Sequence, residues 1–174
     1  LALQTSGAGS TGAVTFNDNV TLGGLTTFGG ASNYAVAFNG GTNTFTNAVT
    51  FNNLGGVTLG NGGDSFIFNG GLTSTASTTT LGGTVATSNY NISLGAVALA
   101  NNSTLSSGSG SIDISGAVNG GSNTLTLQDN TNNLIMKYVE LRIFSKTTKN
   151  QHTKQYVTLR IFYKTTQHTR HPLP

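Results

Sequence analysis

The chain has 174 residues, of which only 7% are charged and 24 are glycine, and it contains no cysteine. Low charge is typical of membrane proteins, but no apolar stretch reaches the about 20 residues that a spanning helix needs. Disorder is disfavoured because short apolar segments recur at close intervals and the net charge is small. The absence of cysteine excludes a disulfide framework and thiolate metal sites.

The first region of the chain consists of short segments with period-two alternation. In each, a β-branched or aromatic residue alternates with a small or polar one, which predicts a strand buried on one face. Asn-Gly-Gly motifs between the segments predict tight corners, and no segment has helical periodicity. The predicted strands lie at residues 13–16, 20–22, 35–38, 48–51, 57–59, 65–68, 79–81, 91–94, 97–99, 111–114 and 124–127.

These strands belong to an internal repeat. The sequence of residues 13–17, Ala-Val-Thr-Phe-Asn, recurs at residues 48–52. Irregular repeats of about 20 residues, each with two or three short strands, are typical of a β-solenoid. We therefore predict an all-β parallel β-helix of about six or seven coils, with Val, Leu, Ile and Phe inward and Thr, Ser and Asn outward. A β-sandwich is the alternative, and the internal repetition favours the solenoid.

Two stretches carry a family resemblance. One is Thr78–Val85 followed by Leu94–Leu99, and the other is Gly108–Gly120 followed by Asn123–Leu127. Together they resemble the repeats of bacterial surface proteins of the filamentous haemagglutinin and autotransporter-passenger type, over about residues 10–130. The resemblance implies a right-handed parallel β-helix, secretion to the bacterial cell surface, and a role as an adhesin or as a stalk that displays other domains.

Charge divides the chain at Met136. All eight Lys and Arg and all three His follow Met136, whereas all 24 glycines precede it. Residues 1–136 carry a formal net charge of −4 and residues 137–174 carry +7, which together give the +3 of the chain. We therefore predict a solenoid region at 1–136 and a separate basic tail at 137–174.

The tail contains a tandem repeat. Residues 138–148 are echoed by residues 156–166 at an offset of 18, and Gln-His-Thr follows each copy. Three interpretations stay open: a charged cap or linker, a basic patch for nucleic acid or an anionic surface, and a non-native extension from a shifted reading frame. Nucleic-acid binding is the least favoured of the three.

Asp64 is the residue that most suggests a metal site. Residues 59–67 match the calcium-binding nonapeptide at every defined position but the first. Only one copy occurs, whereas Ca²⁺ needs six or more oxygen ligands and so successive copies. We therefore interpret Asp64 as a corner residue, and His168 and His171 of the tail as solvated side chains.

Residues 1–136 contain no His, Lys, Arg, Cys or Glu. Their acids are Asp18, Asp64, Asp113 and Asp129, and the spacing pairs none of them for acid–base catalysis. We read Asp18 and Asp129 as turn residues and expect Asp113 to face outward. We expect no enzyme, and we assign no catalytic, cofactor-binding or metal-binding residue.

These observations predict a structural and adhesive segment of a longer secreted bacterial surface protein. We expect its partners to be host or matrix surfaces, including glycans, and the neighbouring coils of a parent chain, without nucleic-acid binding or membrane insertion. The alternatives are a carbohydrate-binding or carbohydrate-acting β-helix and a non-functional fragment. Ice-binding solenoids present threonines in register, but the clusters at 73–75 and 78–80 do not recur at one position of the predicted coil.

Overall fold

The computed structural model describes residues 1–3, 11–30, 33–129 and 134–136, which form an all-β parallel β-solenoid of about five turns. No helix in this part of the chain is long and apolar enough to cross a membrane. The strands are β1 (Ala2–Leu3), β2 (Thr11–Phe16), β3 (Thr21–Leu22), β4 (Leu25–Thr27), β5 (Asn33–Phe38), β6 (Thr42–Phe45), β7 (Val49–Thr50), β8 (Val57–Phe68), β9 (Leu72–Ser74), β10 (Thr79–Thr87), β11 (Ile92–Leu94), β12 (Val97–Leu99), β13 (Ser103–Gly108), β14 (Ile112–Ile114), β15 (Val118–Asn119), β16 (Leu125–Asp129) and β17 (Leu134–Met136).

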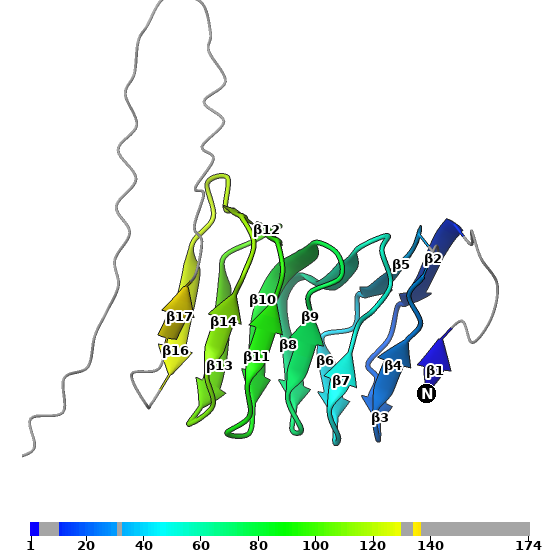
Figure 1. The fold of residues 1–174 in the computed structure, drawn as a ribbon, viewed down its shortest axis with the longest axis horizontal. Helices are drawn as coiled ribbons and strands as arrows, with labels where there is room; N and C mark the ends of the chain where they lie inside the picture. Colours follow the sequence, from blue (N-terminus) through cyan, green and yellow to red (C-terminus); the bar gives the residue numbers. More distant parts are fainter. Residues whose placement is uncertain (4–10, 31–32, 130–133, 137–174) are drawn as a thin grey trace, which may run out of the picture. The chain divides into compact units, whose positions relative to one another are not determined.

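The strands stack in columns, because the chain completes a circuit before it pairs with itself. Every strand pair in the described residues is parallel, which excludes the antiparallel β-sandwich. One sheet has seven strands, and Figure 1 shows them side by side in chain order, from β1 to β17. Its strands are β1, β4, β7, β9, β11, β14 and β17.

The other sheet has ten strands and bends along its length, because β8 and β10 each run round a corner. We call its two halves the first and second columns, and the seven-stranded sheet the third column. The first column comprises β2, β5, residues 57–59 of β8, residues 79–81 of β10, β12 and β15. The second column comprises β3, β6, residues 64–68 of β8, residues 83–87 of β10, β13 and β16.

The solenoid has about five turns, so the prediction of six or seven coils is too high. The early turns are longer than the assumed repeat: Thr26 pairs with Thr50, 24 residues later, whereas Ser93 pairs with Asp113, 20 residues later. Residues 130–133, within the last circuit, lie outside the described residues. The right-handed course of the helix stays a prediction.

Hydrophobic side chains fill the interior and stack on the corresponding residues of neighbouring turns. Phe16 and Phe38 are register partners, and their parallel rings have centroids 4.7 Å apart. Phe38 also meets Phe45 edge-on at 5.6 Å, which joins the first column to the second. Because both parallel and edge-to-face ring pairs are favourable, the rings stabilise contacts along the solenoid axis and across it.

The interior also contains polar side chains, so the prediction of apolar inward positions was partly wrong. Asn43, Asn53 and Ser107 are fully buried. Asn43 donates a hydrogen bond to the backbone carbonyl of Gly40, three residues earlier, at 2.7 Å. Asn53 and Ser107 donate to carbonyls three residues later, those of Gly56 at 2.8 Å and Gly110 at 2.7 Å. A buried polar group is tolerated when it is hydrogen-bonded. These side chains therefore hold the corners between strands.

Exposed asparagines connect the corners of successive turns. The Oδ1 atom of Asn19 accepts a hydrogen bond from the backbone N–H of Thr42 at 2.9 Å, and that of Asn91 accepts one from Ser111 at 3.0 Å. Asn102 makes the same contact 2.9 Å from the Thr124 N–H. The frequent asparagines thus satisfy backbone donors where the strand ladder stops.

Candidate functional site

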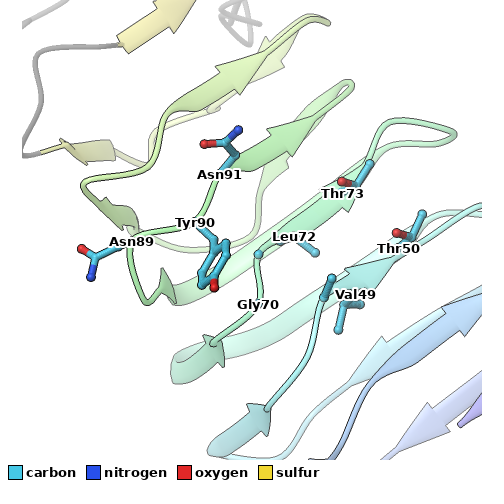
Figure 2. Close-up of a pocket in the computed structure, with 10 residues that line it drawn as sticks. Val49, Thr50, Gly70, Leu72, Thr73, Asn89, Tyr90 and Asn91 are labelled. Atoms are coloured by element: carbon cyan, nitrogen blue, oxygen red, sulfur yellow. The ribbon is translucent and has the colours of Figure 1, made fainter.

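A shallow groove lies on the third column, beside the corner that precedes β11 (Figure 2). Its cavity volume is about 270 Å³. Three successive turns contribute to it, at residues 48–50, 70–73 and 89–91. We call it the Tyr90 groove, because Tyr90 provides its only aromatic side chain.

Glycines on the neighbouring turns leave the Tyr90 ring uncovered. Tyr90 lies two residues before Ile92, whose register partners on the neighbouring turns are Leu72 and Ile112. The residues two positions before these partners are Gly70 and Gly110. A side chain at Gly71 would approach the Tyr90 Cβ atom to 3.2 Å, and the φ angle of Gly71 is +99°, which favours glycine. Tyr90 consequently remains 55% exposed.

The other side of the groove carries outward-facing threonines. Thr50 of β7 and Thr73 of β9 are register partners, and both are partly exposed. The side chains of Asn89 and Asn91 extend away from the groove in Figure 2. Their Oδ1 atoms accept hydrogen bonds from the Ser109 and Ser111 N–H groups at 3.0 Å. The groove therefore presents one ring and two threonine side chains.

Among the residues that the structure describes, no charged side chain lines the Tyr90 groove. Residues 1–136 contain no Lys or Arg. The arrangement suits binding by stacking and neutral hydrogen bonds.

The structure places Asp64 in the corner within β8, as predicted. Its Oδ2 atom accepts hydrogen bonds from the backbone N–H groups of Asn61 at 2.7 Å and Gly62 at 3.3 Å. The carboxylate thus closes the glycine-rich turn that bends β8 from the first column to the second. In the described part of the chain, no group of three or more His, Cys, Asp or Glu lies close enough to hold a metal ion.

The other acids are dispersed. Asp113 lies between buried Ile112 and Ile114 on β14 and faces outward, as expected. Asp18 is exposed in the corner after β2.

Tyr34, the other tyrosine before the tail, is buried. It is only 3% exposed, and its hydroxyl donates to the Leu3 and Phe28 carbonyls at 3.3 and 3.2 Å. Tyr34 and Tyr90 therefore do not form a row of exposed aromatics.

Thr73, in the cluster at 73–75, does recur at one position of the coil, so the expectation was wrong for this residue. Its row runs along the third column through Thr26, Thr50, Thr73 and Ser93. A second row of hydroxyl side chains runs along the second column and includes neither cluster. Its members are Thr42, Ser65, Thr84, Thr104 and Thr126. The next outward position of the second column carries Ile67 and Ala86, so the hydroxyls of that column form one row and not a two-dimensional array.

The basic tail at 137–174, with His152, His168 and His171, lies outside the described residues. Its interpretations as a cap, a linker, a basic patch or a non-native extension stay open. In the sequence, Tyr90 is one of two tyrosines before the tail, and no motif marks it. The feature that distinguishes Tyr90 is that Gly70 and Gly110 occupy the equivalent corner position on the neighbouring turns. This contrast can be found only after the sequences of the turns have been aligned by their register.

Comparison of the chain with family models, with curated proteins and with solved structures finds no match. The structure defines the class of protein as a parallel β-solenoid. The resemblance of the repeats to those of bacterial surface proteins stays a prediction.

Proposed function

We propose that residues 1–136 are a structural and adhesive segment of a secreted bacterial surface protein. The observation that carries this proposal is the continuous parallel stack, in which each turn pairs with the next in all three columns. Backbone hydrogen bonds and stacked side chains then oppose bending and shortening along the whole axis. Such a segment is suited to spacing or displaying other domains.

The outward faces support the adhesive part of this proposal. They carry rows of Thr and Ser without any Lys or Arg, so a contact with another surface forms through many weak hydrogen bonds. Weak contacts of this kind give useful affinity when many copies or many turns bind at once. The expected partners are host or matrix surfaces, including their glycans, and the turns of a longer parent chain at the ends of the stack.

The resemblance to filamentous haemagglutinin and autotransporter passengers points to the same role and to the bacterial cell surface. A carbohydrate-binding β-helix is the second candidate, and the Tyr90 groove is the observation that favours it. A non-functional fragment would show neither attachment nor sugar binding. Attachment measurements separate these possibilities.

The test uses beads coated with the full chain on animal-cell monolayers and on collagen and fibronectin films. We expect retention several-fold above that of albumin-coated beads, and weak competition by the soluble monomer, because the attachment depends on multivalency. Retention equal to that of albumin-coated beads on every surface would contradict the adhesive role. Beads coated with the heat-unfolded chain control for non-specific adsorption.

A further inference from the structure

We propose that the Tyr90 groove binds one ring of a neutral carbohydrate, with the sugar face against Tyr90 and sugar hydroxyls directed to Thr50 and Thr73. The inference deepens the proposed adhesive role, and it rests on that role for the source of the sugar, a surface glycan. It assigns a specific site and a ligand class to a rod that is otherwise covered by similar polar side chains.

The ring of Tyr90 provides the stacking surface. Aromatic rings carry partial negative charge on their faces, which attracts the positively polarised C–H groups of a sugar ring. Tyr90 is 55% exposed, and the equivalent positions on both neighbouring turns are Gly70 and Gly110. A flat ligand therefore reaches the ring without displacing a side chain.

The polar contacts lie across the groove from the ring. Thr50 and Thr73 face outward on adjacent strands, and paired strands lie about 4.8 Å apart. Each hydroxyl both donates and accepts hydrogen bonds, as sugar hydroxyls do. Binding sites for small molecules commonly combine an apolar surface with a few polar groups that orient the ligand.

Charge selects a neutral ligand. A phosphate, sulfate or uronate would find no counter-charge in the described part of the chain, because residues 1–136 contain no Lys or Arg. An ammonium group would find no carboxylate, because no acid lines the groove. A nucleic acid is disfavoured for the same reason, since its affinity depends on basic side chains at the phosphates.

Size restricts the site to one sugar unit. The groove has a volume of about 270 Å³. Pockets that enclose drug-sized ligands have about 300–1,000 Å³. A longer glycan would consequently contact the groove with one unit and extend beyond it, and affinity on a surface would come from repeated sites.

The test is an NMR titration of the isotope-labelled full chain with methyl glucoside, methyl galactoside and methyl mannoside. We expect at least one to give saturable shifts of the backbone amides of Thr50, Thr73 and Tyr90, with a dissociation constant on the order of 1 mM. Glucuronic acid and glucosamine serve as charged comparison probes and should bind more weakly than the corresponding neutral sugar.

Three variants test the assignment of the site. Tyr90→Ala should weaken binding about tenfold, whereas Tyr90→Phe retains the ring and should bind within about twofold of the parent chain. Thr73→Val keeps the shape but removes a hydroxyl, and should weaken binding several-fold. Phe28→Ala removes a 42% exposed aromatic elsewhere and should leave binding unchanged. Amide dispersion of each spectrum verifies the fold.

The inference is overturned if none of the three neutral glycosides gives saturable shifts, if Tyr90→Ala binds as the parent does, or if a charged probe binds more tightly. Its failure is separable from failure of the adhesive role. Beads that attach without any sugar binding would leave the adhesive role standing, whereas sugar binding without attachment would remove that role and retain the site.

Discussion

Phe45 and Phe68 occupy the same position in successive turns, with ring centroids 4.7 Å apart and planes within 5° of parallel. Phe66, two residues before Phe68 on the same strand, adds a third ring at 6.4 Å. All three side chains are fully buried. The aromatic stack therefore contributes three buried rings to the hydrophobic core of these turns.

Truncation of this stack should be costly. We expect Phe68→Ala to lower the free energy of unfolding by about 3–5 kcal/mol, because it removes a buried ring and leaves a cavity. Urea denaturation followed by circular dichroism measures the loss. Phe28→Ala is the matched control, since Phe28 is 42% exposed, and it should cost no more than about 1 kcal/mol. Equal losses in both variants would contradict the buried stack.

Adjacent glycines at the corner after β5 should differ in their tolerance of a methyl group. A Cβ atom at Gly40 would overlap the Asp18 carbonyl group of the preceding turn, whereas at Gly41 the nearest atom is the Asn19 Oδ1 at 4.0 Å. We expect Gly40→Ala to destabilise the fold by about 2 kcal/mol. Gly41→Ala should change stability by no more than about 0.5 kcal/mol. Thermal unfolding of the two variants side by side decides the matter.

Asn53 should be essential to the corner between β7 and β8. Its Nδ2 atom donates to the Tyr34 and Gly56 carbonyls at 3.1 and 2.8 Å, and its Oδ1 accepts from the Thr27 hydroxyl at 3.1 Å. Asn53→Ala leaves these buried groups without partners and should cost about 3 kcal/mol. The comparison variant is Asn39→Ala, which removes an exposed contact to Asn17. A urea midpoint as high for Asn53→Ala as for Asn39→Ala would speak against the buried network.

Calcium should not stabilise the corner at Asp64. Its Oδ2 atom already accepts two backbone hydrogen bonds, and among the described residues Asp64 belongs to no group of three or more His, Cys, Asp or Glu that could hold a metal ion. We expect the unfolding temperature in millimolar CaCl₂ and in EDTA to agree within about 1 °C, because a cation that does not bind the folded state does not stabilise it. Calorimetry in both buffers is the measurement. A calcium-dependent increase that Asp64→Asn abolishes would establish a metal site instead.

Sequence patterns located the strands whose inward residues are apolar. The predicted strands at 35–38, 97–99 and 111–114 match β5, β12 and β14 within two residues. Strands with polar inward residues were missed. In β6 one of the two buried positions holds Asn43, and in β13 two of the three buried positions hold Ser103 and Ser107. With a single apolar inward residue, each of these strands carries a weak hydrophobic signal.

The sequence by itself determined the class of fold. Alternating β-branched and small residues, Asn-Gly corners and the internal repeat were sufficient to predict a parallel solenoid at 1–136, since these features depend only on neighbours along the chain. The number of turns and the register were decided by the tertiary structure, because turn length varies and each strand pairs with residues 18 to 24 positions away. The Tyr90 groove depends on that register, which sets Tyr90 between two glycines of neighbouring turns.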